Sequence, residues 1–360
     1  MRKIIISQRR GTTLAVVIQG DEVSAIYSAQ DTKPQLVGNI YKGRVKNFLP
    51  GMQAAFVDIG RDRNVFLQFN RKQRLSVGQS VLIQIDKDEG LTKGARATLN
   101  ISLAGRLMIF LPTLGYIGVS NKIGGDERQR LHQLARKIRP KESGLILRTA
   151  AQGCSEEDLL GDLANLQALW SKIVERNSKR KPPALLHSDD LIDKLLRNEY
   201  AAGNELIVDN VKLYRRLVSL VSNVKLYDGS AQIFEAFGVS EELAKINQRE
   251  LSLPSGGQIV IDKTEALTAI DVNTGKFIGR DDFEETILKT NLEAAELILK
   301  QLRLRDLGGI IVVDFIDMDS TAHKNTLMNF LRERAALDGN KTKIVDMTPL
   351  GLVEITRHSR

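Results

Sequence analysis

The sequence predicts a multidomain protein of the mixed α+β class, and three observations support this prediction. The chain has 360 residues, more than one hydrophobic core usually holds. Residues 36–100 form a series of short strand-like segments separated by turn residues, a pattern typical of small barrels. Residues 247–360 contain strand-like segments separated by a long helical one, which is typical of a sheet covered by helices.

The predicted barrel displays two aromatic side chains on its outer face. Strand alternation in residues 54–59 and 64–67 puts the small aliphatic side chains on one face and Phe56 and Phe66 on the other. Cations lie near them in the sequence, among them Lys87 and Lys93. Exposed rings beside cations are how OB-type barrels bind single strands, so we predict single-stranded RNA as the ligand. The alternative is that both rings pack under a neighbouring domain.

Residues 101–190 form a mixed region in which we predict helices at 127–138 and 156–174. An apolar strand at 145–149 ends on Arg148 and Thr149. Arginine can bind a phosphate through two parallel hydrogen bonds, and threonine adds a hydroxyl donor. An ordinary salt bridge is the alternative for Arg148. Residues 177–183 contain three basic residues and two prolines, so we predict a linker there.

The C-terminal part is predicted to form a hairpin, a long helix and a further strand. The hairpin strands are residues 258–261 and 267–272. Asp281 and Asp282 precede glutamates at capping-box spacing, and Gly308-Gly309 ends the helix. One face of this helix is expected to carry its apolar residues Leu288, Leu292, Ala295, Leu299 and Leu302. The run at 310–313 is typical of a buried strand, and it ends on Asp314.

Two aspartates at strand ends predict a metal site. Asp271 ends the second hairpin strand and Asp314 ends the strand after the helix. A crossover connection would place both at the same sheet edge, where their charges repel unless a cation binds. Mg²⁺ takes one or two carboxylates and keeps positions for water and phosphate; Mn²⁺ is also possible. Asn273 lies on the same strand face as Asp271. Turn formation is the alternative for Asp271 and Asn273, and Asp317 and Asp319 compete as ligands.

Composition limits the other classes of function. The net charge is +8 with a pI near 9.4, which suits a polyanionic partner. Cys154 is the only cysteine and the four histidines have no metal-ligand spacing, so no zinc site is expected in this chain. No apolar run is long enough to cross a bilayer and no signal peptide is recognisable. We therefore expect a cytoplasmic protein without a membrane segment.

Several stretches of the chain resemble the ribonuclease E/G family, bacterial endoribonucleases that process and degrade RNA. They are GNIYKG at 38–43, AAFVD at 54–58, TAIDVN at 268–273, NLEAA at 291–295, RLRDLGG at 303–309 and DFIDM at 314–318. The resemblance implies a ribonuclease-H-like domain in two segments, 1–35 and 191–246, with an OB-fold barrel at 36–100 inserted. It further implies a 5′-sensor domain at 101–190 and a deoxyribonuclease-I-like α/β nuclease domain at 247–360.

The resemblance also implies roles for individual residues. Asp271 and Asp314 match the metal-binding aspartates and Asn273 the assisting asparagine, so these three are the expected catalytic residues. The expected RNA-binding residues are Phe56, Phe66 and Lys93, with Lys87 added from its position on the barrel. The expected pocket for a 5′ monophosphate comprises Gly105, Ile109, Arg148 and Thr149.

The resulting functional expectation is Mg²⁺-dependent cleavage of single-stranded RNA in A/U-rich segments, in rRNA processing and mRNA decay, with 5′-monophosphorylated substrates preferred. The alternative is a catalytically silent RNA-binding protein that keeps the barrel but not the assembled nuclease site. The family usually continues into a paired-cysteine segment that shares zinc between subunits, and the sequence stops at Arg360 without it. The resemblance leads us to expect a homo-oligomer. Without the paired cysteines, a zinc-linked dimer is doubtful.

Overall fold

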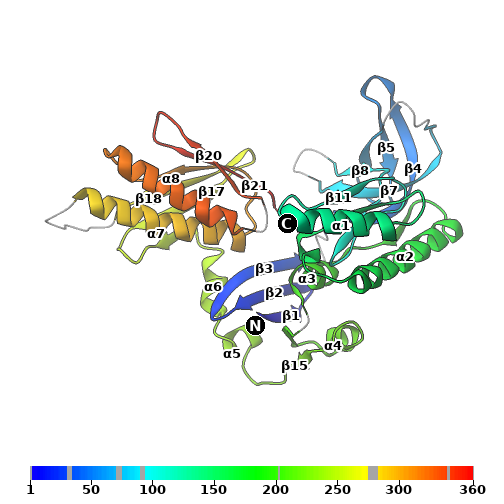
Figure 1. Cartoon of the computed structure of the whole chain (residues 1–360), viewed down its shortest axis with the longest axis horizontal. Helices are drawn as coiled ribbons and strands as arrows, with labels where there is room; N and C mark the ends of the chain where they lie inside the picture. The colour runs from blue at the N-terminus through cyan, green and yellow to red at the C-terminus, as the bar shows by residue number, and fades with distance from the viewer. Residues whose placement is uncertain are drawn as a thin grey trace. The chain divides into compact units, whose positions relative to one another are not determined.

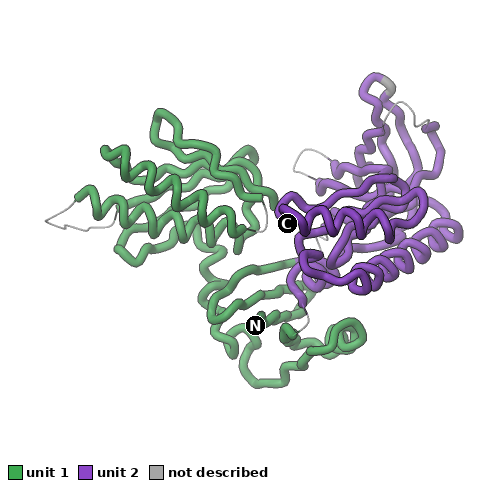
Figure 2. The backbone as a smooth tube through the Cα atoms, in the orientation of Figure 1, with its two compact units in different colours: residues 1–28, 202–360 green, residues 29–201 purple. Residues whose placement is uncertain are grey.

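The computed structural model describes residues 2–30, 35–69, 75–89, 94–201, 203–274, 283–338 and 341–359. The chain divides into two compact units, residues 1–28 with 202–360 and residues 29–201 (Figure 2). Both contain sheets and helices (Figure 1), so the predicted mixed α+β class is confirmed. No helix among the described residues is long and apolar enough to span a bilayer.

The second unit contains a closed five-stranded barrel, compatible with an OB-fold. Its order is β4-β5-β6-β8-β7, and pairing of β4 with β7 closes it. A sixth strand, β13, pairs with β4 and adds to the barrel sheet. The short helix η1 (Pro50–Met52) joins β4 to β5. The barrel strands are β4 (Ile40–Leu49), β5 (Ala54–Asp58), β6 (Val65–Gln68), β7 (Ser80–Lys87) and β8 (Arg96–Thr98), with β13 (Ala184–His187) beside them.

After the barrel strands along the chain, the same unit forms a four-stranded sheet with two long helices. The sheet has the order β11-β12-β10-β9, and its core includes Leu131 of α1 and Leu159 of α2. The strands are β9 (Leu103–Ala104), β10 (Met108–Leu111), β11 (Ile117–Val119) and β12 (Gly144–Leu147); the helices are α1 (Gly125–Ile138), η2 (Thr149–Ala151) and α2 (Glu156–Lys179).

The prediction of a linker at residues 177–183 is wrong at its beginning. α2 continues to Lys179 because its C-terminal turns are tied down: the Arg176 guanidinium donates to Leu186 O, and Lys42 Nζ donates to Asn177 O. The next helix, α3 (Leu191–Glu199), belongs to the same unit, since Lys194 Nζ donates to Val37 O. The predicted four-part division at residues 35, 100, 190 and 246 stays a prediction.

The first unit begins with a five-stranded sheet built from two separated segments. β14 and β15 run parallel to β1, whereas β2 pairs with β1 antiparallel and β3 follows β2. The side chain of Asp209 joins the segments by accepting from Ser7 Oγ, Gln8 N and Arg9 Nε. The elements are β1 (Arg2–Arg9), β2 (Thr12–Gln19), β3 (Glu22–Gln30), β14 (Glu205–Val208), β15 (Val224–Leu226), α4 (Val211–Val218), α5 (Ile233–Ala236) and α6 (Ser240–Lys245).

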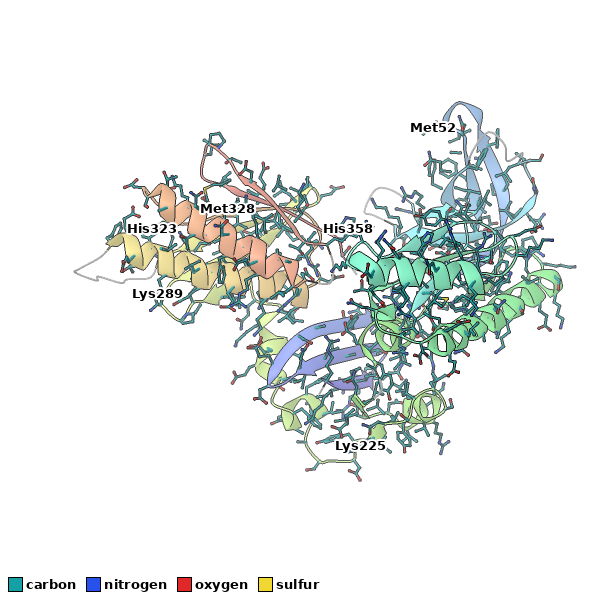
Figure 3. All side chains as sticks on the ribbon, viewed as in Figure 1. Met52, Lys225, Lys289, His323, Met328 and His358 are labelled. Atoms are coloured by element: carbon teal, nitrogen blue, oxygen red, sulfur yellow. The ribbon has the colours of Figure 1, made fainter. Side chains whose placement is uncertain are left out.

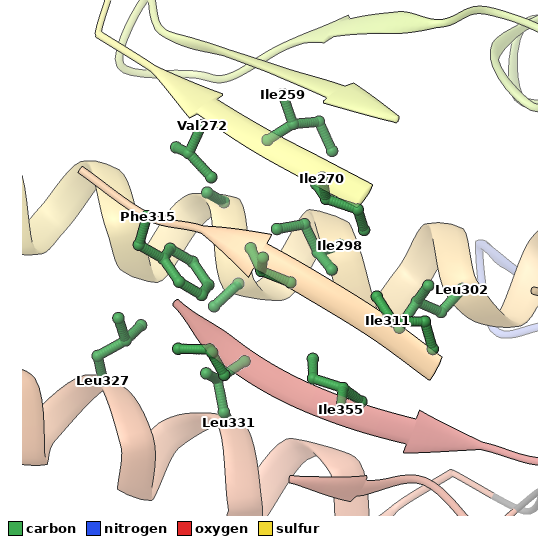
Figure 4. Close-up of a cluster of buried hydrophobic side chains, with 14 of the residues drawn as sticks. Ile259, Ile270, Val272, Ile298, Leu302, Ile311, Phe315, Leu327, Leu331 and Ile355 are labelled. Carbon is green, nitrogen blue, oxygen red and sulfur yellow. The ribbon is translucent and has the colours of Figure 1, made fainter. Parts of the chain in front are cut away.

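Among the described residues, the C-terminal sheet of this unit has helices packed on one face. Its order is β16-β17-β18-β19-β21-β20, and the connection through α7 makes β18 and β19 parallel neighbours. α7 and α8 contact each other over an apolar core (Figure 4). The elements are β16 (Glu250–Ser252), β17 (Gln258–Lys263), β18 (Leu267–Asn273), α7 (Phe283–Leu304), β19 (Gly309–Asp314), α8 (Thr321–Ala336), β20 (Lys343–Met347) and β21 (Val353–Arg357).

The predicted hairpin, helix and strand are all present, but the buried face of α7 differs from the prediction. Ala295 and Leu302 are buried as predicted, but Leu288, Leu292 and Leu299 are only partly buried. The fully enclosed stripe includes Ile287, Ala294, Ile298 and the polar residues Asn291 and Gln301, which an apolar pattern could not identify. The predicted capping residues Asp281 and Asp282 lie outside the described residues.

Candidate metal site and nucleic-acid interface

Asp271 and Asp314 are direct neighbours at the carboxyl ends of two parallel strands. They are register partners across β18 and β19, and neighbouring strands lie about 4.8 Å apart. Both side chains are exposed, whereas Ile270, Val272 and Val313 next to them are buried against the helices. Strand alternation therefore turns both carboxylates to the face of the sheet that α7 and α8 leave open. The structure thus brings together the two residues that the strand-end argument selected.

Asn273 supports this pair from the same strand face. Its Nδ2 donates to Asp271 Oδ2 at 2.6 Å, which fixes the orientation of that carboxylate. The two aspartates line a cavity of about 310 Å³, together with apolar side chains of neighbouring strands. Its remaining lining residues are Val260, Asp262, Ala269, Ile270, Val312 and Leu352.

The two carboxylates of Asp271 and Asp314 fit Mg²⁺ or Mn²⁺ better than a metal ion that is coordinated by protein ligands alone. Among the described residues, no three His, Cys, Asp or Glu side chains are grouped to hold an ion. Two carboxylates on an open face suit Mg²⁺, which keeps several waters and binds substrate phosphates. Asp262 is less suited as a third ligand, because Arg249 donates to both of its carboxylate oxygens, at 2.6 and 2.7 Å. These hydrogen bonds lower the pKa of Asp262.

A set of hydrogen bonds from α7 holds the segment that follows Asp314. Asn291 is fully buried, and its amide both donates to Ile316 O and accepts from Ile316 N. Glu284 accepts from Asp319 N at 2.9 Å and lies 3.1 Å from Nδ1 of His323, which Figure 3 labels. The hydrogen bond from Asp319 N is the largest cause of the lowered pKa of Glu284. Sequence reasoning assigned no role to Asn291, although the NLEAA motif contains it, and it considered Glu284 only as a capping-box residue.

The same segment contains Asp317 and Asp319, the two aspartates that compete with Asp314 as metal ligands. Ser320 is the N-cap of α8, where its side chain accepts from His323 N. Asp317 and Asp319 are both exposed and follow the end of β19. Asp319 is engaged through its backbone by Glu284. Neither has a register partner on β18, so Asp314 remains the candidate ligand on this strand.

On the barrel, Phe56 and Phe66 lie side by side on the outer surface. They are register partners across β5 and β6, and their ring centroids are 6.0 Å apart at an interplanar angle of 70°. Both are half-buried, whereas Ala55, Val57 and Leu67 are buried in the barrel core. The predicted alternation is therefore confirmed. The two rings form a partly exposed aromatic surface on which bases can stack.

Cations border this aromatic surface. Lys87 is exposed at the end of β7, and its register partner on β8 is Arg96. Arg96 is also the register partner of Phe66, a proximity that sequence reasoning missed because β6 and β8 are far apart along the chain. Asp86 raises the pKa of Arg96 through a hydrogen bond and its charge. Lys93, the other predicted RNA-binding lysine, lies outside the described residues.

The predicted 5′-phosphate residues meet at the end of β12. The Arg148 guanidinium donates to Gly105 O at 2.8 Å and to Asn198 Oδ1 at 2.7 Å. Burial, and then the nearby charge of Arg197, lower the pKa of Arg148 from its usual value, but arginine stays charged in proteins. Thr149 is exposed, with its hydroxyl 2.9 Å from that of Ser120. No carboxylate pairs with Arg148 within hydrogen-bonding distance among the described residues, so the ordinary salt bridge is not seen.

Gly105 occupies a position where a side chain does not fit. A Cβ atom there would lie 2.4 Å from Asp162 Oδ2. Asp162 of α2 accepts from the backbone N–H groups of Arg106, Leu107 and Met108 and so holds the turn between β9 and β10. Ile109 follows on β10 and is half-buried. The glycine thus keeps this turn, and with it the carbonyl that Arg148 contacts, in place.

An aromatic, cation-bordered barrel suits the binding of a single strand, and a pair of strand-end carboxylates suits a metal ion that assists phosphodiester hydrolysis. Together they are compatible with the class of metal-dependent nucleases. Comparison with known proteins agrees with this class. The family model described as "Ribonuclease E/G family" matches residues 102–360. Ribonuclease G of Salmonella typhimurium is 35% identical over 99% of this chain and 79% of its own length. Ribonuclease G of Haemophilus influenzae is 36% identical over 96% and 77%, and ribonuclease E of Escherichia coli is 36% identical over 99% and 37%. The chain belongs to the ribonuclease E/G family.

Proposed function

We propose that the chain is an endoribonuclease that hydrolyses single-stranded RNA at Asp271 and Asp314 with a bound Mg²⁺ ion. Membership of the ribonuclease E/G family places it among the hydrolases that act on RNA. The observation that carries the proposal is the in-register pair of exposed carboxylates at the ends of β18 and β19. The cavity that they line gives a phosphodiester access to both.

The protein residues have separate tasks in this proposal. Asp271 and Asp314 hold the ion, and Asn273 keeps Asp271 oriented through the 2.6 Å hydrogen bond. When bound, Mg²⁺ polarises the scissile phosphate and makes a coordinated water more acidic. Val312 and Leu352 present apolar surface beside the carboxylates, which can contact a sugar or base. Asn291 keeps the backbone after Asp314 in place, so it is a positioning residue.

The barrel and the Arg148 region serve substrate selection in this proposal. Phe56 and Phe66 stack bases while Lys87 interacts with the phosphate backbone, as single-strand-binding barrels do. Arg148 and Thr149 bind a 5′ monophosphate, so 5′-monophosphorylated RNA is the preferred substrate. The ribonuclease-H-like and deoxyribonuclease-I-like domains belong to the proposal as well. They are supported by the sheet joined from two segments and by the register pair of Asp271 and Asp314 on the C-terminal sheet.

The test is cleavage of an internally labelled single-stranded RNA with Mg²⁺, with Mn²⁺ and with EDTA. Asp271→Asn and Asp314→Asn are expected to abolish internal cuts while the barrel retains RNA binding. Asp346→Asn is the matched control, because Asp346 is an exposed carboxylate of the same sheet that does not line the cavity. Asp317→Asn shows whether a third carboxylate assists.

Internal cuts that persist in both variants would refute the metal assignment. RNA binding by the unaltered protein without any cleavage would instead support the alternative of a catalytically silent RNA-binding protein. Light scattering on the same samples measures the oligomeric state, for which the resemblance leads us to expect a homo-oligomer.

A further inference from the structure

The turn between β20 and β21 (Figure 1) lies beside the candidate metal site. β21 pairs antiparallel with β19, with Val353 opposite Val313. The turn that precedes β21 is therefore at the sheet edge where β19 ends on Asp314. Leu352, the last residue before β21, lines the same cavity as Asp271 and Asp314. A nucleotide whose phosphate reaches the two carboxylates thus comes close to this turn.

Hydrogen bonds hold the turn in one conformation. Thr348 N donates to Leu352 O at 2.8 Å, and Gly351 N donates to Thr348 O at 2.9 Å. Leu352 N donates to Thr348 Oγ1 at 3.2 Å. Gly351 has a φ of 87°, which favours glycine, and the ring of Pro349 fixes its own φ. A Cβ atom on Gly351 would lie 3.6 Å from Asp317 Oδ1, so the turn lies close to the segment that follows β19.

The tip of this turn presents an apolar side chain to solvent. Leu350 is 83% exposed, and no other large apolar side chain among the described residues is more exposed. A single exposed leucine is ordinary on a protein surface. Leu350 differs because its backbone is held by the turn and because Leu352 and Val312 present further apolar surface in the cavity next to it. A side chain on an ordered backbone loses little conformational freedom when it contacts a ligand.

We propose that Leu350 is a wedge that unstacks a base next to the scissile phosphate. Its side chain covers one face of that base and so replaces the contact with the neighbouring base. Proteins that kink nucleic acids insert apolar side chains, leucine among them, between base steps in this way. Because every base has an apolar face, the wedge acts on stacking and not on base identity. This role rests on the proposed hydrolysis of single-stranded RNA at Asp271 and Asp314.

Unstacking favours the reaction because it frees the phosphate. In a stacked strand the phosphate is held in a regular helical backbone. Metal-assisted hydrolysis requires the attacking and leaving oxygens to lie in line through phosphorus, and a strand with one broken stack can bend to reach this arrangement. Runs of adenosine stack strongly in single strands, whereas runs of uridine stack weakly. The wedge should therefore matter for adenosine and much less for uridine.

The experiment measures kcat and KM for two single-stranded RNAs with identical flanks and a central hexa-adenosine or hexauridine segment. We expect Leu350→Ala to lower kcat/KM for cuts in the adenosine segment roughly 5- to 10-fold, the effect of losing about half of the burial of one leucine. Most of the loss should appear in kcat, because the barrel still binds the strand. Cleavage of the uridine segment should hardly change, and Leu350→Met, which keeps a long apolar side chain, should retain most of the activity on adenosine.

A second measurement observes the unstacking itself. 2-Aminopurine in the adenosine segment is quenched while it is stacked, so its fluorescence in a stopped flow should rise before the first cut. Leu350→Ala should reduce this rise. Leu337→Ala is the matched control for both measurements, because Leu337 is 71% exposed at the end of α8 and does not line the cavity. It should change neither, and thermal melting shows whether each variant remains folded.

The outcomes distinguish the wedge from the proposed function. Equal loss of activity on both segments in Leu350→Ala, or a fluorescence rise of unchanged size, would overturn the wedge and leave the nuclease assignment intact. A lower mass of Leu350→Ala in light scattering would assign the side chain to a contact between copies of the chain and would also overturn it. Absence of cleavage of either RNA by the unaltered protein would contradict the proposed function itself.

Discussion

Replacing Arg148 by alanine should remove the preference for 5′-monophosphorylated RNA without abolishing cleavage. The guanidinium has five N–H donors, and two of them are used by Gly105 O and Asn198 Oδ1. The remaining donors allow one two-point contact with a phosphate. Hydrogen bonds to charged groups contribute about 1.5–3 kcal/mol each, and partial exposure favours the lower end. Since 1.4 kcal/mol corresponds to a factor of ten, the advantage of a 5′ phosphate should fall roughly 10- to 100-fold.

The assay compares kcat/KM for two RNAs that differ only in carrying a 5′ monophosphate or a 5′ hydroxyl. Arg148→Lys keeps the charge but loses the two-point geometry, so it should retain part of the preference. Lys172→Ala, which removes an exposed charge from α2, is the matched control and should change both rates alike. If Arg148→Ala lowered cleavage of both RNAs by the same factor, the assignment of this residue to the 5′ phosphate would be refuted.

Three further predictions concern binding and stability. Phe56→Ala should weaken binding of single-stranded RNA, measured by fluorescence anisotropy, roughly 5- to 150-fold, the effect of one stacked base. Phe56→Leu, which keeps an apolar side chain, should weaken binding nearly as much. Unchanged affinity of the Phe56→Leu variant would show that apolar packing, not base stacking, matters. Asn291→Ala should lower the free energy of unfolding in urea by about 2–4 kcal/mol, because both backbone groups of Ile316 lose their partner; a change below the error of the titration would contradict this account. Burial lowers the pKa of His187 below 6.5, so the unfolded state binds more protons below that pH and the free energy of unfolding should fall as the solution is acidified from pH 7. His187→Gln should flatten this dependence, and an equally steep profile in that variant would exclude His187 as its origin.

The described structure agrees with much of what local patterns predicted. Strand alternation identified the outward faces of Phe56 and Phe66, since a side-chain period of two is visible in a few residues. The hairpin at β17 and β18 was predicted from strand-like runs and turn residues, and β19 from its continuous apolar run. The expectation that this whole run is buried is wrong, because the described helices cover the face that holds Ile311 and Val313, and Ile310 on the other face is exposed. Asp271 and Asp314 could be selected because a crossover connection is nearly always right-handed and places parallel strand ends together.

Such local patterns could not predict contacts between segments that are far apart in the sequence. The sequence shows Arg96 and Phe66 as 30 positions apart, and only the closure of the barrel makes β6 and β8 neighbours. The buried polar face of α7 is another case. Asn291 interrupts the apolar pattern, and its enclosure is stable only because Ile316 satisfies its amide. This pairing depends on the packing of α7 against the end of β19.

The sequence by itself therefore determined the class of the protein, the positions of Asp271 and Asp314 at strand ends, and the aromatic face of its barrel. These features follow from short-range periodicity and from residue types. The pair of Asn273 with Asp271 could be anticipated, because its two residues share one strand. Only the tertiary structure placed Asp86 beside Arg96 and Asn198 beside Arg148, since these residues are joined by the pairing of strands and the packing of helices.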